Sequence, residues 1–426
     1  MSRIAVIGTG YVGLTTGACL AHLGHTVVCA DVDERKVASL QAGVVPILEH
    51  RLDELVAEGI DKGRLSFTAD SKAAVADAEV VFLCVPTPQG DDGSADLSYV
   101  QAAAAEIADA LPFECIVVNK STVPVGSTQV VARAIRRGDV RVVSNPEFLR
   151  EGSAVDDFLN PDRVVVGCDD PDAARKVGEL YESVKPQLII TDPASAELIK
   201  YAANAFLATK LSFINAIATI CEQVGADIDD VVVGVGYDPR IGPHFLRPGP
   251  GWGGSCFPKD TRALQKIAAD AGYEFSLLRS VVDANEQQFD RTADKVRVAA
   301  GGSLDGVVVG VWGLTFKART DDLRDSPSIA VIERLLAAGA QVQAFDPTVA
   351  GPKRGLPEGV RVAGDAVAAA SGATVLVVLT EWDDFKWIDP ADVAPVMDGP
   401  HVIDGRNILD RAHWSRAGLH VAGIGR

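Results

Sequence analysis

Cys256 is the residue whose type and surroundings point most directly to chemistry. It lies in a glycine-rich run, GPGWGGSCFPKD at 249–260, with Lys259 and Asp260 just beyond the thiol. Glycine permits positive φ and close backbone approach, so we expect this loop to be moulded around a ligand. Only the thiolate attacks, and a nearby cation favours it. We therefore predict a nucleophilic cysteine; the alternative is a buried apolar thiol, which is our interpretation of the other six cysteines.

A second group of polar residues lies in a largely apolar helical segment, AELIKYAANAF at 196–206. Lys200 and Asn204 are four residues apart and therefore share one helical face. An ammonium beside apolar side chains either snorkels to solvent or opposes a developing oxyanion, with the amide adding a hydrogen bond. Glu147 and Glu151 follow a strand end and are candidate acid–base groups, against the alternative of a solvated surface pair.

The chain begins with a dinucleotide-binding pattern. Gly8-x-Gly10-x-x-Gly13 follows an expected strand at 4–7 and opens an expected helix at 12–23, and the second strand, 26–30, ends at Asp31. The glycines allow the turn, the approach of the pyrophosphate and close helix–strand packing, while the helix N-terminus faces the phosphates. Asp31 should bind the ribose and repel a 2′-phosphate, so NAD is favoured over NADP. Arg35 and Lys36 weaken that preference.

These residues need a scaffold, and the hydrophobic pattern predicts two β/α regions joined by helices. Apolar strands are expected at 80–85, 115–118, 164–166, 307–312, 341–345 and 374–379, and helices at 195–224, 277–298 and 326–338. Continuous apolar strands of this kind are typical of parallel sheets. We predict two Rossmann-like doubly wound parallel-sheet domains joined by a long helical connector. The expected boundaries are 1–192, 193–298 with the cysteine loop, and 299–426.

Composition limits the classes of function. The 426 residues are 47% apolar and 23% charged, with a formal net charge of −18, which argues against broad binding of nucleic acid or anionic membranes. Seven cysteines without a CxxC pair fit a reducing compartment and predict no metal site. The glycines in the apolar start argue against a signal segment, and no uninterrupted apolar span is expected to approach membrane length. We expect a cytoplasmic protein.

Six segments together resemble a known family. They are GTGYVG at 8–13, STVPVG at 121–126, NPEFLREG at 145–152, ELIKYAANAF at 197–206, GPGWGGSCFPKD at 249–260 and GLTFK at 313–317. In order and spacing they are similar to the UDP-glucose 6-dehydrogenase branch of the UDP-glucose/GDP-mannose dehydrogenase family, from residue 1 to about 410. The resemblance implies NAD-dependent, four-electron oxidation of UDP-glucose to UDP-glucuronate, a precursor of polysaccharides, by a homodimer.

The resemblance also assigns roles to residues. Those matching the family's catalytic positions are Cys256, Lys200, Asn204, Asp260, Glu147 and Thr122, the threonine that holds a catalytic water. Those matching the cofactor side are Gly8, Gly10, Tyr11, Val12, Gly13, Asp31, Lys36, Val85, Thr87, Ser121, Thr122, Glu151, Lys259 and Arg324. Those matching the substrate side are Glu147, Phe148, Leu149, Arg150, Lys200, Asn204, Arg240, Phe245, Leu246, Gly249, Gly253, Phe316, Lys317 and Arg406. In the family, the arginine matching Arg240 reaches the ligand from a neighbouring subunit.

The implied chemistry explains why a thiol is needed. An aldehyde carbon must gain a nucleophile before it can lose a second hydride, and Cys256 would supply it as a thiohemiacetal that is oxidised to a thioester. Rival readings are a sibling enzyme acting on GDP-mannose or a UDP-N-acetylhexosamine, a two-electron hydroxy-acid dehydrogenase, and a non-enzymatic NAD-sensing protein. The run DPRIGPHFLRPG at 238–249 resembles the UDP-glucose branch. The third region lacks a GxGxxG, which fits UDP rather than a second NAD.

Overall fold

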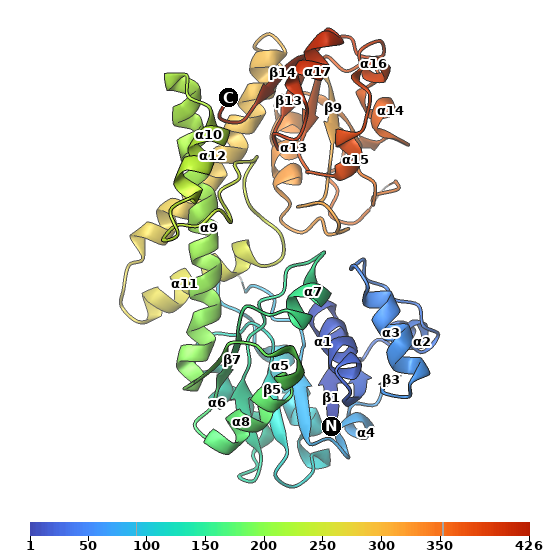
Figure 1. Ribbon diagram of the computed structural model, residues 1–426, viewed down its shortest axis with the longest axis vertical. Coiled ribbons are helices and arrows are strands. Elements are labelled where there is room, and N and C mark those ends of the chain that lie inside the picture. Colours follow the sequence, from blue (N-terminus) through green and yellow to red (C-terminus); the bar gives the residue numbers. More distant parts are fainter. Residues whose placement is uncertain (91, 352) are drawn as a thin grey trace. The chain divides into compact units, whose positions relative to one another are not determined.

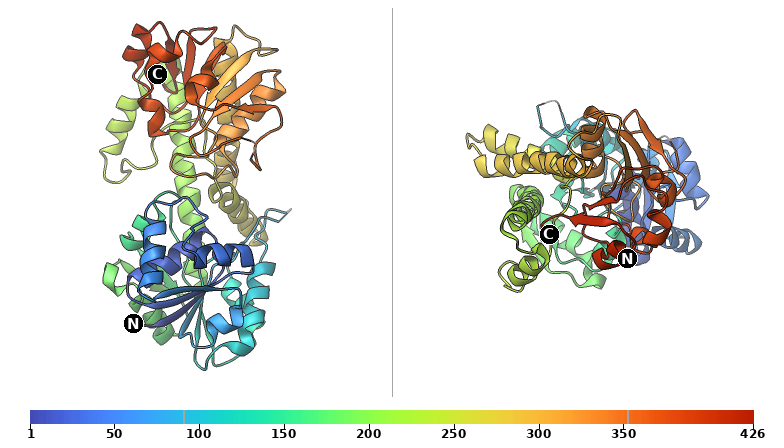
Figure 2. Two further views of the ribbon diagram at one scale, coloured as in Figure 1. Left: turned by 90° about the vertical axis from the view of Figure 1, so that its right-hand side faces the viewer. Right: turned by 90° about the horizontal axis from the view of Figure 1, so that it is seen from above.

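The computed structural model describes residues 1–90, 92–351 and 353–426 and falls into two units (Figures 1 and 2). The first unit comprises Met1–Ala203 with Arg262–Gly272, and the second comprises Asn204–Thr261 with Tyr273–Arg426. Each unit contains one sheet with helices on both faces. The predicted architecture of two parallel-sheet domains and a long connecting helix is confirmed.

The sheet of the first unit has eight strands in the order β3-β2-β1-β4-β5-β6-β7-β8. The strands are β1 (Arg3–Ile7), β2 (Thr26–Ala30), β3 (Leu65–Thr68), β4 (Val80–Leu83), β5 (Ile116–Asn119), β6 (Arg141–Ser144), β7 (Val164–Gly167) and β8 (Leu188–Thr191). Neighbouring strands are parallel apart from β6 and β7, which meet at Ser144 and Gly167 in an antiparallel pair. The prediction of a parallel sheet missed this reversal, which arises because the connection at 145–163 returns to the same end of the sheet.

Helices cover both faces of this sheet because its central strands are apolar on both sides. The unit contains α1 (Tyr11–His22), α2 (Glu34–Gln41), α3 (Leu52–Asp61), α4 (Ser71–Val75), α5 (Ser98–Ile107), η1 (Ala108–Ala110), α6 (Ser127–Ile135), α7 (Ala154–Leu159), α8 (Pro171–Glu179) and η2 (Glu182–Val184). Along β1, Ile4 and Val6 join the core under α1, α3, α7 and α8, whereas Ala5 and Ile7 join the core under α4, α5 and α6.

The predicted connector is one continuous helix, α9 (Pro193–Val224), of 32 residues. By length and composition alone α9 is long and apolar enough to cross a membrane. Its apolar residues are interrupted by Glu197, Lys200 and Lys210, so it is not the uninterrupted apolar span that the sequence was expected to lack. Within the first unit, however, its Glu197 carboxylate accepts hydrogen bonds from Gly126 N and Thr128 N, at 2.6 and 2.8 Å. These buried polar contacts belong to a helix packed in a protein core.

The second unit has a six-stranded sheet in the order β11-β10-β9-β12-β13-β14, with parallel neighbours throughout its described residues. The strands are β9 (Val308–Trp312), β10 (Gln341–Phe345), β11 (Val360–Val362), β12 (Val375–Val378), β13 (His401–Asp404) and β14 (His420–Gly423). The remaining helices are α10 (Ile228–Gly236), α11 (Phe257–Asp270), α12 (Ser276–Ala299), α13 (Pro327–Ala337), α14 (Ala366–Ala370), α15 (Asp383–Lys386), α16 (Pro390–Val393) and α17 (Arg411–Arg416). α12 and α13 pack on one face and α14–α17 on the other.

The two sheets repeat the same turn after their first strand. Gly8 follows β1 with φ of 96° and donates its N–H to Ala30 O at 2.7 Å; Gly313 follows β9 with φ of 97° and donates to Phe345 O at 2.8 Å. An aspartate follows the second strand in each case, Asp31 after β2 and Asp346 after β10. The likeness between the two ends of the chain therefore extends from strand order to single hydrogen bonds.

Candidate functional site

The glycine loop of the first unit has the geometry that a pyrophosphate requires. Gly8 has the positive φ of the turn, and a Cβ atom at Gly13 would lie 1.9 Å from Gly8 O. A Cβ atom at Gly10, by contrast, would meet no other heavy atom of the described residues within 4 Å. Gly10 is also the N-cap of α1 and provides no side-chain cap, so the first N–H groups of a 12-residue helix are available to an anion. This cradle fits the phosphates of NAD.

Asp31 completes the cofactor side at the end of β2. Its Oδ2 accepts from Thr9 N at 2.8 Å, Thr9 Oγ1 at 2.6 Å and Lys36 Nζ at 2.9 Å. Its Oδ1 accepts from Asp33 N at 3.0 Å and has no second donor among the described residues. Burial raises the pKa of Asp31, but these hydrogen bonds outweigh it and hold the pKa at about 2. The carboxylate is therefore ionised at neutral pH and retains capacity on Oδ1 for a ribose hydroxyl.

The loops after β4 and β5 lie beside this cradle, where the strand order of the sheet reverses. Ser121 Oγ donates to Val85 O at 2.7 Å, and Thr87 Oγ1 donates to Thr122 O at 2.9 Å. These bonds join four of the predicted cofactor residues into one wall. Val12 packs against the adjoining core.

Tyr11 links the glycine loop to the segment containing Glu151. Gly152 N donates to Tyr11 Oη at 2.8 Å and to Glu49 Oε2 at 2.6 Å, and Tyr11 also hydrogen-bonds to Glu49. Glu49 Oε1 accepts from Ala154 N at 2.9 Å. The sequence reasoning missed Glu49; a carboxylate within the mixed segment 42–51 has no spacing that indicates this role.

Glu147 and Lys200 form a buried ion pair within the first unit. Lys200 Nζ donates to Glu147 Oε1 at 2.8 Å, and Leu149 N donates to Glu147 Oε2 at 2.6 Å. The ammonium also lies 5.5 Å from the centroid of the Phe148 ring. Burial raises the pKa of Glu147, but the charge of Lys200 and these hydrogen bonds together lower it by more than burial raises it. The net shift of the pKa is therefore downward. Lys200 is buried, which excludes the snorkelling alternative.

Arg150, predicted to bind substrate, is in contact with a carboxylate of its own segment. Its backbone N donates to Asp157 Oδ2 at 2.8 Å, and its guanidinium forms a further ion pair with Asp157. The Arg150 side chain is well exposed, so it can exchange this partner for a ligand.

In the second unit, Asp260 forms hydrogen bonds with the polar residues around Cys256. Asn204 Nδ2 donates to Asp260 Oδ2 at 2.6 Å and Lys259 Nζ donates to Asp260 Oδ1 at 2.6 Å, while Asp260 N donates to Cys256 O at 2.8 Å. Asp260 is fully buried, and Cys256 is partly exposed. The thiol immediately precedes α11, and a helix N-terminus favours negative charge nearby. The cluster of Cys256, Lys259, Asp260 and Asn204 is therefore suited to an anionic sulfur and a polarised water.

The glycine-rich loop before Cys256 was expected to pack closely around a ligand, but the atoms that approach its glycines belong to the protein itself. A Cβ atom would lie 2.3 Å from Phe289 at Gly251, 1.9 Å from Asp325 O at Gly253 and 2.7 Å from Phe316 at Gly254. These three glycines are thus required by packing within the second unit. A ligand-binding role for Gly253 stays a prediction.

Four polar residues that the sequence reasoning missed hold this loop in place. Asn285 Oδ1 accepts from Trp252 N at 2.8 Å, and Asn285 Nδ2 donates to Trp252 O at 2.9 Å. Asn215 and Gln288 bind the backbone of Gly249, and Ser212 accepts from the Trp252 indole. The available signal was a polar residue on the buried face of an apolar helix, which requires a partner.

Arg406 brings three predicted segments together in the second unit. Its Nε donates to Leu379 O at 2.7 Å and its Nη2 to Phe316 O at 3.3 Å, while Nη1 would lie 3.2 Å from a Cβ atom at Gly249. Lys317 Nζ lies 5.5 Å from the centroid of the Phe316 ring. GLTFK at 313–317, Arg406 and the glycine-rich loop are therefore neighbours.

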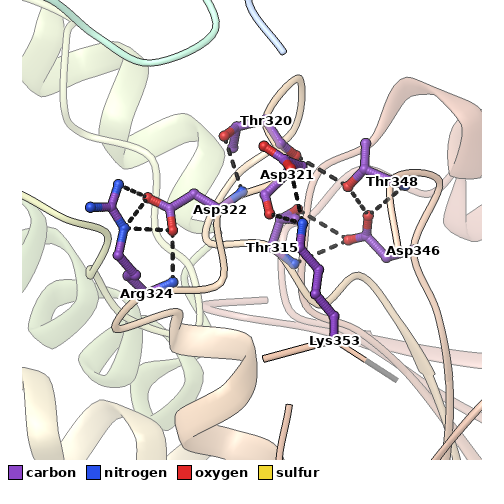
Figure 3. Close-up of polar contacts among 8 residues, drawn as sticks. All are labelled: Thr315, Thr320, Asp321, Asp322, Arg324, Asp346, Thr348 and Lys353. Atoms are coloured by element: carbon purple, nitrogen blue, oxygen red, sulfur yellow. Dashed lines mark hydrogen bonds and ion pairs between the residues drawn. The ribbon is translucent and has the colours of Figure 1, made fainter. Parts of the chain in front are cut away.

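Arg324 is held by the loop between β9 and α13, as Figure 3 shows. Its Nη2 and Nε donate to Asp322, at 2.6 and 2.9 Å, and Asp322 N donates to Thr320 Oγ1 at 3.2 Å. Lys353 Nζ binds Asp321 Oδ2 at 2.9 Å on the other side of the same loop (Figure 3). A loop fixed at both sides presents the exposed Arg324 side chain at a defined position.

The remaining predicted residues lie on the segment after α10. Arg240 has an 87% exposed side chain and pairs with Asp238, whereas Leu246 is buried. Phe245 adopts a positive φ of 60° and lies 6.3 Å, centroid to centroid, from Phe257 at the start of α11.

A doubly wound sheet with a pyrophosphate cradle and a carboxylate at the end of its second strand defines an NAD-dependent dehydrogenase. Family models match three parts of the chain: the UDP-glucose/GDP-mannose dehydrogenase family NAD binding domain at 2–185, its central domain at 194–287 and its UDP binding domain at 310–411. The chain belongs to the UDP-glucose/GDP-mannose dehydrogenase family. It therefore uses NAD and acts on a nucleotide sugar.

Individual relatives agree along the whole chain. A UDP-glucose 6-dehydrogenase of Rhizobium meliloti is 49% identical, covering 100% of this chain and 99% of its own. A UDP-glucose 6-dehydrogenase of Bacillus subtilis is 45% identical, and the match covers 100% of this chain and 94% of the relative. Among solved structures, a UDP-glucose dehydrogenase from Pyrobaculum islandicum superposes with a TM-score of 0.91 at 37% identity, covering 100% and 98%. The fold and family expected from the six motifs are confirmed.

Proposed function

We propose that this protein oxidises C6 of UDP-glucose twice, yielding UDP-glucuronate and reducing two NAD for each sugar. The observation that carries the proposal is the partly exposed Cys256 at the start of α11, with Asn204 and Lys259 converging on the buried Asp260. A two-electron dehydrogenase has no use for this thiol. The similarity to UDP-glucose 6-dehydrogenases at 45–49% identity supports UDP-glucose as the sugar nucleotide.

The first oxidation converts the C6 alcohol to an aldehyde. NAD, when bound, accepts the hydride from carbon. The protein must take the hydroxyl proton and stabilise the oxygen as it becomes negative, and Lys200 is assigned the second task because its ammonium is buried and held beside Glu147. Glu147 is assigned acid–base work in the later steps.

The second oxidation requires Cys256. Its thiolate adds to the aldehyde carbon, forming a C–S bond and an oxyanion. Transfer of hydride from that carbon to a second NAD would then leave a thioester. Water attacks the thioester carbon, the C–S bond breaks, and the thiol and the carboxylate are released. We assign Asp260 and Asn204 to orient or activate this water because both are already hydrogen-bonded to each other next to the cysteine loop. Thr122 matches the family threonine that holds a water.

We infer a division of labour along the chain. Residues 1–192 bind NAD, 193–298 supply the cysteine loop, and 299–426 bind the UDP-sugar. Local cations suit the diphosphate in a protein whose net charge is −18: Lys317 lies in the loop between β9 and α13, Arg240 is exposed after α10, and Arg406 lies beside Phe316. The glycine cradle of the first unit supports the cofactor role of 1–192.

We also infer a cytoplasmic homodimer without nucleic-acid or membrane partners. Phe206, Phe213, Ile220 and Val224 recur along α9 at intervals of seven and four and are all exposed in the second unit, which is typical of a helix face covered in an assembly. The exposed Arg240 is free to reach a second copy, as its family counterpart does.

The test counts reduced cofactor for each sugar nucleotide oxidised. With UDP-glucose, GDP-mannose and UDP-N-acetylhexosamines, and with NAD or NADP, we expect two NADH for each UDP-glucose and little turnover of the others. Cys256→Ser should retain nucleotide binding but stop after the first oxidation or at a slowly hydrolysed ester. Cys168→Ser, at a partly exposed cysteine outside the loop, is the matched control and should behave as wild type. Steady turnover of Cys256→Ser near the wild-type rate would contradict the covalent scheme.

A further inference from the structure

Lys120 is a buried lysine without an ion pair in the described part of the chain. It follows β5 and is only 5% exposed. Its Nζ donates to two neutral oxygens, Asn145 Oδ1 at 3.0 Å and Tyr181 Oη at 3.3 Å. The ammonium also lies 5.5 Å from the centroid of the Tyr181 ring and 6.0 Å from that of Phe158. Fully buried lysines are rare unless they are paired with a carboxylate.

Folding does not explain this charge. Transferring an ammonium from water into a protein interior costs free energy, and replacing such a group by an apolar one of similar shape is often neutral or stabilising. The neighbours would also remain satisfied without Lys120: Tyr181 Oη donates to Asn145 Oδ1 at 2.8 Å, and Asn145 Nδ2 donates to Val165 O at 2.7 Å. A charge that folding does not require is evidence for a functional role.

The position of Lys120 connects it to the Glu147–Lys200 pair. Asn145, which Lys120 binds, precedes Glu147 by two residues in the segment after β6. The charge of Lys120 acts on Glu147 and lowers its pKa, after the larger effects of burial, of Lys200 and of the hydrogen bond from Leu149 N. Glu147 offsets the charge of Lys200, so the pair by itself is neutral. With Lys120, this buried group carries a net charge of plus one.

We propose that Lys120 is a positioning residue whose positive charge, acting from behind the Glu147–Lys200 pair, supports the anionic oxygen that forms on the substrate during oxidation. The inference rests on the proposed function of Lys200. A neutral ion pair has little net field to offer a new anion, whereas a group with net charge of plus one becomes neutral when the oxyanion forms. Lys120 makes no contact with substrate in this scheme.

The surrounding groups make the effect of pH on Lys120 separable. Burial lowers the pKa of Lys120 to about 8, with Cys84 and Glu147 raising it and Lys200 lowering it. Burial raises the pKa of Cys84 to about 12 and also raises that of Tyr181, so both stay neutral near pH 8. Arg163 also lies over the ring of Phe148, with its Cζ 3.8 Å from the ring centroid. Lys120 therefore loses its charge as pH rises through about 8.

The test compares Lys120→Met, which removes charge and hydrogen bonds, with Lys120→Gln, which keeps a neutral donor. Removing a direct oxyanion donor lowers the rate by roughly 10²–10³. Removing a charge that acts through the Glu147–Lys200 pair should lower kcat by less, about tenfold. We expect this loss in both variants below pH 8, with little change in KM for NAD or sugar nucleotide. The ratio of wild-type to variant kcat should fall toward one above pH about 8. Melting temperatures should equal or exceed wild type.

The control is Lys62→Met, which removes a cation of the same unit from the exposed pair with Glu58 and should leave kcat unchanged at every pH. The inference is overturned if Lys120→Met keeps kcat within about twofold of wild type, if Lys120→Gln recovers the rate, if the ratio is independent of pH, or if both variants melt well below wild type. A wild-type protein that oxidises another sugar nucleotide instead would contradict the proposed substrate. The Lys120 variants would then be measured on that substrate, so the two failures remain distinct.

Discussion

The Glu147–Lys200 ion pair allows a quantitative test of whether water is excluded from this part of the first unit. The two side chains are 6% and 4% exposed and lie 2.8 Å apart. Breaking a buried pair by removing one partner typically costs about 3–5 kcal/mol, because an unpaired charge stays buried. Glu147→Gln should cost about 3 kcal/mol, near the lower end, because the ring of Phe148 still faces the ammonium. Lys200→Met should cost about 2 kcal/mol, because Leu149 N still binds Glu147.

The double variant leaves neither charge and should cost only about 2 kcal/mol in total, which implies a coupling energy of about 3 kcal/mol. All five tryptophans lie in the second unit, so fluorescence would follow the wrong part of the molecule. Hydrogen exchange of peptides from β1, β4 and β5 in urea reports on the first unit, with tryptophan fluorescence as the internal control. The net pKa of Glu147 is lowered, so the stabilisation is present above the ordinary carboxyl pKa and is lost as pH falls through the folded-state value.

Additive effects of the two single variants, with coupling below about 0.5 kcal/mol near neutral pH, would refute the reasoning. Such a result would mean that water screens the pair. Lys200 would then have no special strength as an oxyanion partner, and the argument for Lys120 would lose its premise.

Three further predictions concern other carboxylates and the buried lysine. Asp31→Ser should raise KM for NAD at least tenfold and weaken discrimination against NADP with little change in kcat, measured as kcat/KM for both cofactors. Its matched control is Asp346→Ser. That variant should instead lower the unfolding midpoint seen by tryptophan fluorescence, because Trp382 Nε1 binds Asp346. Glu197→Gln can accept with only one oxygen from donors that now bind two, so it should cost about 1–3 kcal/mol and speed hydrogen exchange at 121–128. The pKa of Lys120 is lowered from 10.5 to about 8, so between pH about 8 and 10.5 the unfolded chain binds a proton that the folded protein does not. Wild type should therefore gain stability relative to Lys120→Met as pH rises through this range, as paired melting curves would show. A constant difference in melting temperature would contradict the lowered pKa.

The sequence predicted the elements whose signal is local. β2 and β10 begin and end at the expected residues, and Gly8, Gly10 and Gly13 show the three roles expected of them. Such features depend on backbone sterics and on alternating burial within a few residues, which the sequence states directly.

Contacts between distant segments could not be predicted in the same way. Helical spacing placed Lys200 and Asn204 on one face of α9, but it could not show that each binds a different carboxylate, Glu147 and Asp260. The glycines before Cys256 were interpreted as space for a ligand, whereas three of them make room for Phe289, Asp325 and Phe316. Glycine signals close approach but does not identify the approaching atom.

The repeated turn in the two units shows why one binds a dinucleotide and the other does not. Asp346 occupies the position of Asp31, yet it is 1% exposed and accepts six hydrogen bonds: Oδ2 from Leu314 N, Thr315 N, Thr315 Oγ1 and Trp382 Nε1, and Oδ1 from Thr348 N and Thr348 Oγ1. Two carboxylate oxygens have about four lone-pair sites, so none remains for a ribose. Asp31 accepts from Thr9 N, Thr9 Oγ1 and Lys36 Nζ on Oδ2 but has a single donor among the described residues, Asp33 N, on Oδ1. The same fold thus keeps a carboxylate for a ligand in the first unit and uses it to fix the turn in the second. We therefore propose that a nucleotide in the second unit is held by cations such as Lys317, in the loop between β9 and α13, rather than at the strand end, where Asp346 binds the turn (Figure 3).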